Sequence, residues 1–245
     1  PDPPGGLIVR DAAGSPTGLL KDAAMGLVNK VVPPLTPARR AQALTRALEH
    51  AGSLGVTSVR DMGPDAGDLS AYAAFAEEGR LTVRISAAPP ELQWADQARL
   101  GIRRAFGTPF FRLGAVKGFA DGSLGSTTAY FFEPYADAPA TRGLLADEMI
   151  PIEGMRQRLT AADAAGLQLC IHAIGDQAIS VVLDLFTDVA RANGARDRRF
   201  RIEHAQHVAP KDFDRFASQG VVAAVQPYHA IDDGRWAERR IGPAR

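Results

Sequence analysis

Three residues that can take part in binding a metal ion, Lys117, His172 and His204, each stand at the end of a predicted strand. Residues 113–116 and 169–171 are apolar, as in buried strands, and residues 200–203 alternate apolar and charged side chains, as in a strand with one buried face. In a barrel of parallel strands, the carboxyl ends of the strands meet at the mouth of the active site. Imidazole is a common zinc ligand, so the pattern predicts that the two histidine rings converge on one metal site.

Lys117 can join such a site only after a chemical change. An ammonium group has three donors and no lone pair, so it cannot bind a cation. Burial lowers the pKa of a lysine, and the neutral amine can take up carbon dioxide as a carbamate. The carbamate is an anionic oxygen ligand that can bridge two metals. A carbamate at Lys117 could therefore join the two histidines as a metal ligand.

Asp121, Ser123 and His229 are the candidate substrate contacts. Asp121 and Ser123 lie in a glycine-rich segment over residues 118–126, and His229 follows a later apolar run. The glycine spacing matches neither the dinucleotide nor the nucleoside-triphosphate pattern, so phosphate binding is disfavoured. A loop over the site is the favoured interpretation, because glycines allow a close approach of the backbone.

The other histidines carry weaker signals. A single histidine at a strand end is more often structural, and only its repetition on successive strands favours metal binding. His207 lies in the loop after His204, where it either supports the metal ligands or faces solvent. His50 lies on a predicted helix, and we expect it at the surface.

Apolar runs alternate with amphipathic helical runs, a rhythm typical of parallel βαβ units. Helices are predicted from the cap pair Thr36-Pro37 to about Ser53, from a cap at Asp68 to near Gly79, from Asp176 to Gly194 and from Pro210 to Gly220. Six strands are predicted, at residues 56–60, 81–87, 111–117, 167–172, 200–204 and 221–226.

Two segments depart from this rhythm. Residues 1–35 suggest a hairpin-like insertion before the first predicted strand, which leaves residues 36–245 as the main domain. Residues 118–147 form one long connection, rich in Gly, Ser, Thr and Pro, and long loops in compact domains are often functional.

The composition excludes several classes of partner. Of 245 residues, 46% are hydrophobic, 28 are basic and 28 are acidic, which predicts a sizeable core and gives no reason to expect nucleic acid. No apolar run approaches the length of about 20 residues that crosses a bilayer. We expect a small-molecule substrate, and a homo-oligomer is compatible with the sequence. The single cysteine, Cys170, excludes an internal disulfide.

Six segments form a specific pattern in a fixed order: GLLKDAA (18–24), GVTSVRDMG (55–63), VKGFADGSLGS (116–126), IHAIGD (171–176), RIEHAQH (201–207) and QPYHA (226–230). With them the chain resembles the metal-dependent amidohydrolase superfamily, in its family 3 branch. The resemblance implies an α/β fold, a (β/α)8 TIM-type barrel. It assigns Lys117 to barrel strand 4, His172 to strand 5 and His204 to strand 6. It also implies that these residues hold one or two divalent metals, by preference zinc, with a lysine carbamate at Lys117.

The chain also departs from the family pattern. The His-x-His pair of strand 1 and the aspartate of strand 8, which binds metal and carries the proton, have no counterpart here. Thr127 stands where many relatives carry arginine. We therefore expect an incomplete barrel with strands 2–7 present and strands 1 and 8 missing, and a catalytic acid/base that lies outside this sequence.

The predicted activity is hydrolysis of a C–N bond, in an amide, formamide or cyclic amide, by metal-activated water. The chain itself would be a catalytically incomplete fragment. Two alternatives stay open at this stage. One is a non-enzymatic ligand-binding relative, and the other is a lyase or isomerase that uses Lys117 as a free amine.

Overall fold

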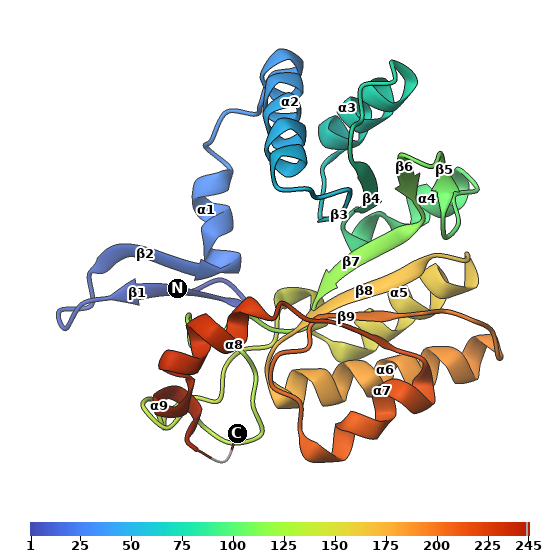
Figure 1. Ribbon diagram of the computed structural model, residues 1–245. Coiled ribbons are helices and arrows are strands. Elements are labelled where there is room, and N and C mark those ends of the chain that lie inside the picture. Colours follow the sequence, from blue (N-terminus) through green and yellow to red (C-terminus); the bar gives the residue numbers. More distant parts are fainter. Residues whose placement is uncertain (244) are drawn as a thin grey trace. The chain divides into compact units, whose positions relative to one another are not determined.

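The computed structural model describes residues 1–243 and 245 (Figure 1). The strands are β1 (Gly6–Arg10), β2 (Pro16–Asp22), β3 (Ser58–Met62), β4 (Arg84–Ala88), β5 (Phe106–Gly107), β6 (Phe111–Leu113), β7 (Ala115–Phe119), β8 (Gln168–Ala173), β9 (Arg201–His204) and β10 (Val222–Ala224). The α-helices are α1 (Gly26–Asn29), α2 (Pro37–Ser53), α3 (Ala66–Glu77), α4 (Trp94–Arg99), α5 (Ile152–Ala164), α6 (Asp176–Asn193), α7 (Phe213–Gln219), α8 (Tyr228–Asp232) and α9 (Ala237–Ile241). Short 3-10 helices are η1 (Ala23–Met25), η2 (Glu91–Gln93), η3 (Asp147–Met149), η4 (Pro210–Asp212) and η5 (Asp233–Arg235).

The chain forms two compact units. The first contains Pro1–Val32, Gly118–Thr160 and Ile171–Arg245, and the second contains Pro33–Lys117 and Ala161–Cys170. The boundary between them passes through β7, β8 and α5. The predicted division of the chain after residue 35 stays a prediction.

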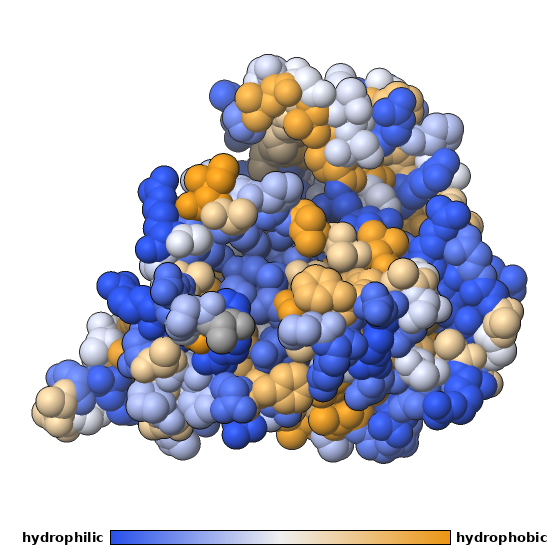
Figure 2. All heavy atoms as spheres, turned by 60° about the horizontal axis from the view of Figure 1, so that its bottom comes forward, coloured by the Kyte–Doolittle hydropathy of each residue, from blue (hydrophilic) through white to orange (hydrophobic). Residues whose placement is uncertain are grey.

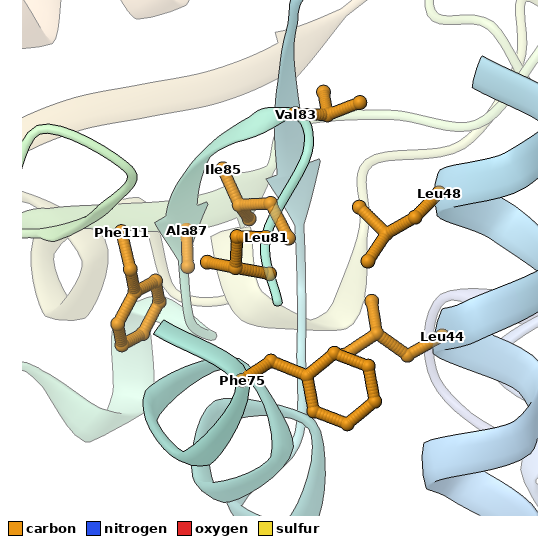
Figure 3. Close-up of a cluster of buried hydrophobic side chains, with 8 residues drawn as sticks. All are labelled: Leu44, Leu48, Phe75, Leu81, Val83, Ile85, Ala87 and Phe111. Carbon is orange, nitrogen blue, oxygen red and sulfur yellow. The ribbon is translucent and has the colours of Figure 1, made fainter. Parts of the chain in front are cut away.

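The second unit is built on a sheet with the strand order β3-β4-β6-β5. β3 pairs with β4 and β4 with β6 in parallel, and β5 adds an antiparallel edge. Burial of a large apolar side chain contributes about 1.5–3 kcal/mol, so the cluster beneath α2 and α3 holds these helices on the sheet. Figure 3 shows its members: Leu44, Leu48, Phe75, Leu81, Val83, Ile85, Ala87 and Phe111.

The helix starts of this unit show one success and one error of prediction. The hydroxyl of Thr36 accepts from the Arg39 amide at 3.3 Å, as expected for the cap of α2. The predicted cap of α3, Asp68, is wrong. Asp65 has the extended backbone that a cap requires, and Asp68 is the third helical residue, whose carboxylate accepts from the Asp65 amide at 3.1 Å.

The predicted strand over residues 111–117 is two strands in different sheets. β6 ends at Leu113 and β7 begins at Ala115, and the chain turns between them at Gly114, which has φ +100°. A Cβ at Gly114 would lie 1.9 Å from the carbonyl oxygen of Arg103. Glycine is therefore required both by the backbone conformation and by the close approach of a neighbouring chain segment.

The first unit contains the carboxyl ends of the strands that carry the candidate histidines. The sheet order is β10-β9-β8-β7, and β10 pairs with β9 in parallel. Every residue of β8 is buried, as in strands that are covered on both faces. In Figure 1, α6 and α7 lie on the same side of β8 and β9. Buried Asp212, at the start of α7, accepts from Ser180 of α6 and from Arg215, and so ties the two helices together.

The first unit also contains the predicted hairpin. β1 and β2 pair antiparallel, with Ile8 opposite Leu20. The ammonium group of Lys21 donates to the carbonyl oxygen of Ser126 at 2.5 Å, so the hairpin is attached to the long loop between β7 and α5.

These sheets confirm an α/β fold with parallel strands. Its completion into an eight-stranded barrel stays a prediction. Across the described ranges, no helix is long and apolar enough to cross a membrane. Figure 2 shows one face of the molecule, which is mostly hydrophilic with apolar residues exposed between the polar ones.

Candidate metal centre

The structure brings His172 and His204 together. His172 lies at the end of β8 and His204 at the end of β9, and these strands are neighbours in the sheet. The centroids of the two imidazole rings lie 4.7 Å apart, with an angle of 69° between the ring planes. The two rings therefore lie together, as their positions at strand ends predicted. That they bind a metal stays a prediction.

A backbone carbonyl determines which nitrogen of His172 carries the proton. Its Nε2 lies 2.8 Å from the carbonyl oxygen of Gly122, and 3.4 Å from a carboxylate oxygen of Asp121. Both partners only accept, so Nε2 carries the proton and donates it. In this tautomer the lone pair is on Nδ1, which is then the nitrogen that could bind a metal.

His204 has the opposite arrangement. Its Nδ1 lies 2.7 Å from the side-chain oxygen of Gln226, which accepts, so the proton is on Nδ1 and the lone pair on Nε2. His204 has φ +74° and Ala205 has φ +44°. Such left-handed conformations in residues other than glycine cost on the order of 1–3 kcal/mol and cluster at functional sites.

A cavity of about 330 Å³ lies beside His204. The rings of His229 and His204 are 5.9 Å apart and nearly parallel, at 25°. Burial lowers the pKa of His207 to about 4, so this residue is neutral at neutral pH. Its Nε2 is buried and has no hydrogen-bond partner in the part of the chain that the structure describes. The polar side chains that line the cavity are His204, Gln206, His207, Gln226, His229 and Asp233.

Asp121 anchors the long loop. Its carboxylate is buried and accepts from the backbone amides of Tyr130 at 2.8 Å, Ile174 at 3.0 Å and Gly175 at 2.8 Å. Tyr130 lies in the loop, and Ile174 and Gly175 connect β8 to α6. The carboxylate therefore joins the loop to the segment that follows His172. A direct contact of Asp121 with substrate stays a prediction.

Ser123 bonds within the same loop. Its hydroxyl oxygen lies 2.7 Å from that of Ser126, and its backbone amide donates to the hydroxyl of Thr128 at 3.1 Å. A contact of Ser123 with substrate also stays a prediction.

A second cavity of about 330 Å³ is lined by this loop and the hairpin. Phe119, Asp121 and Gly122 form one part of its wall, and Asp22 and Asn29 form another. Because the carbonyl of Gly122 also accepts from His172, this cavity borders the candidate centre.

Lys117 is buried, at 4% exposure, in β7, the strand next to β8. Its backbone amide donates to the carbonyl oxygen of Pro89 at 2.8 Å. Lys117 belongs to the second unit and the histidines to the first, so its place beside them stays a prediction. Over residues 1–243 and 245, no group of three or more His, Cys, Asp and Glu side chains is placed to hold a metal ion.

Sequence comparison identifies the relatives of this chain. A family model described as the Amidohydrolase family matches residues 1–245. Protein LONG AFTER FAR-RED 3 of Arabidopsis thaliana is 41% identical over 257 residues, which cover 100% of this chain and 43% of that protein. YtcJ of Bacillus subtilis, whose name describes it as a candidate amidohydrolase, is 32% identical over 253 residues, which cover 100% of this chain and 46% of that protein. The chain thus spans less than half the length of these relatives.

Solved structures agree with this relationship. The crystal structure of an uncharacterised metal-dependent hydrolase from Pyrococcus horikoshii matches with a TM-score of 0.78 and 33% identity, over 91% of this chain and 43% of that one. A second, from Pyrococcus furiosus, matches with a TM-score of 0.78 and 31% identity, over 91% of this chain and 44% of that one. From the family model, the sequence relatives and these structures, the chain belongs to the amidohydrolase family, in its family 3 branch.

Proposed function

We propose that this chain carries part of the active site of a metal-dependent hydrolase that cleaves a C–N bond in an amide, formamide or cyclic amide. The observation that carries the proposal is the pair of neighbouring imidazoles, His172 and His204, at the ends of adjacent strands. Each ring gives one nitrogen to an oxygen acceptor, and each therefore keeps a lone pair on the other nitrogen. This donor set fits zinc, which prefers neutral imidazole and anionic oxygen ligands.

In this proposal, His172 would bind the metal through Nδ1 and His204 through Nε2. Lys117 would add a carbamate oxygen, which is consistent with its burial, because desolvation favours the neutral amine that reacts with carbon dioxide. One or two divalent ions, zinc by preference, would be held in this way. When bound, the metal supplies a water nucleophile at neutral pH by lowering the pKa of that water towards about 7.

The remaining residues would position the substrate. His229, which stacks beside His204 in the first cavity, would contact a polar group of the substrate. The loop that Asp121 anchors would exclude water from the second cavity, which Asp121 lines. Asp121 and Ser123 would be the substrate contacts from this loop. We also propose that strands from outside this sequence complete an eight-stranded barrel and supply the acid/base that protonates the leaving nitrogen.

The test is the metal content and turnover of His172→Ala and His204→Ala in the full-length enzyme, with His50→Ala as the control. His50 is an exposed histidine on α2, so its loss should change neither quantity. Each of the other two variants should lose most of its zinc, measured by elemental analysis after dialysis. Hydrolysis of a panel of formamides and N-acyl amines should fall by at least about 100-fold. Full zinc content and turnover in both variants would show that these histidines are structural.

A further inference from the structure

We propose that Gln226 is a positioning residue, which fixes the tautomer and the orientation of His204 so that Nε2 faces the metal. This inference rests on the proposed function, since it concerns one of the two histidines proposed as ligands. Gln226 lies two residues beyond the end of β10, the strand that pairs in parallel with the strand of His204. The oxygen of its side-chain amide lies 2.7 Å from Nδ1 of His204.

A second hydrogen bond sets the direction of the amide group. The side-chain nitrogen of Gln226 donates to the backbone carbonyl oxygen of Ala224 at 3.2 Å. A reversed amide would place two oxygens against each other at Ala224 and lose that bond. The amide oxygen therefore stays towards His204, where it can only accept, and it selects the tautomer with the proton on Nδ1.

His204 needs this support more than His172 does. The His172 ring is buried and donates to a backbone carbonyl that no side-chain substitution removes. The His204 ring is only half-buried and lines an open cavity, and its backbone has the strained φ of +74°. The loss of an outer partner of a metal-binding histidine typically lowers metal affinity by about 10- to 100-fold.

Three variants distinguish the effect of the hydrogen-bond acceptor on Gln226 from the effect of side-chain packing. Gln226→Met keeps an unbranched side chain of similar length but removes the amide oxygen. Gln226→Glu keeps an oxygen acceptor. Gln206→Met is the matched control, because Gln206 lines the same cavity but its amide bonds to Asp233 and not to an imidazole.

The first measurement is the zinc dissociation constant, from competition with a chromogenic chelator, with zinc alone as the probe. Gln226→Met should bind zinc about 10- to 100-fold more weakly than the wild type. Gln226→Glu should bind at least as tightly as the wild type, and Gln206→Met should match it within about twofold. Thermal unfolding of each metal-free variant shows whether the fold is kept.

The second measurement does not need metal. Long-range ¹H–¹⁵N spectra of the metal-free protein report which nitrogen of His204 carries the proton, with the signal assigned by its loss in His204→Ala. The wild type should show the proton on Nδ1, and Gln226→Met should show it moved to Nε2 or exchanging between the two. A His204 tautomer that is the same in the wild type and in Gln226→Met would overturn the inference, even where zinc binding fails and the proposed function with it. Equal weakening of zinc binding in Gln226→Met and Gln226→Glu would overturn it too.

Discussion

Replacing Asp121 by asparagine tests how the long loop is held beside the candidate metal centre. The side chain keeps its size, but one of its two oxygens becomes a donor. With the amide oxygen in the place that accepts from Tyr130 and Gly175, the new amino group faces the N–H of Ile174 and the protonated Nε2 of His172. Donor then faces donor, and at least one buried backbone amide loses its partner.

The size of the effect follows from these contacts. A hydrogen bond to a charged group contributes about 1.5–3 kcal/mol, and a buried donor left without a partner costs about 1–3 kcal/mol. The two retained bonds also weaken, because a neutral acceptor replaces a carboxylate. Removal of a buried charge offsets part of this loss. Asp121→Asn should therefore lower the free energy of unfolding by about 2–4 kcal/mol. If only the loop detaches and the rest of the chain stays folded, the loss is smaller.

Two measurements check this prediction. Thermal unfolding should show a loss of about 5–15 °C for a chain of this size. Hydrogen exchange at the amides of Tyr130, Ile174 and Gly175 should accelerate by about 30- to 1000-fold, the factor that corresponds to 2–4 kcal/mol. Asp137→Asn is the control from the same loop, because Asp137 makes only a partly exposed ion pair with Arg240 and should change stability by less than about 1 kcal/mol. If Asp121→Asn leaves both the melting temperature and the exchange rates unchanged, Asp121 does not anchor the loop.

Three further predictions use other parts of the chain. Burial lowers the pKa of His207 from 6.5 to about 4, so between these values the unfolded chain binds a proton that the folded chain does not. Stability should therefore fall as the pH drops from 7 to 4.5, and His207→Phe should remove about 2 kcal/mol of that fall in urea unfolding. Gly114→Ala should cost at least about 3 kcal/mol, because a Cβ there meets the Arg103 carbonyl. Gly14→Ala is the control, because Gly14 also has a positive φ but no atom lies near the position of a Cβ. It should lower the free energy of unfolding by about 1 kcal/mol, measured for both variants by thermal unfolding. Lys117→Ala should lower the zinc content per chain and abolish turnover, and unchanged zinc and activity would exclude a carbamate ligand at Lys117.

Local sequence signals predicted the helices α2, α3, α6 and α7 and the hairpin, because each of these depends on neighbours in the chain. The Thr36-Pro37 pair caps α2 through contacts within one helical turn. The start of α3 was misplaced because either aspartate of a capping box can serve as the cap on composition alone. Only the backbone conformation at Asp65 shows which of the two precedes the helix. Helix α5, which starts after Pro151 inside a polar stretch, was missed because its amphipathic pattern is weak.

The break in the strand at Gly114 is a feature that the periodicity of the sequence does not reveal. Residues 111–117 fit a single strand pattern, because the segments on either side of Gly114 have similar strand-forming compositions. The signal was the glycine itself, since glycine inside a strand pattern often marks a bulge or a close backbone approach. The carbonyl that approaches it belongs to Arg103, and no pattern in the sequence connects these two residues.

Part of the candidate centre could be predicted from the sequence, and part of it appears only in the folded chain. His172 and His204 were predictable because a chemical type recurs at one structural position, the end of a strand, and the parallel topology then brings the rings together. The partners that set their tautomers were not predictable in this way. The partner of His172 is a backbone carbonyl, that of Gly122, which has no side chain by which a sequence could mark it. Gln226 is a common polar residue at the end of a predicted strand, and only its contact with His204 distinguishes it. Residue type and position can therefore indicate which histidines could bind a metal, but the nitrogen that each one offers is decided by hydrogen bonds that appear only in the folded chain.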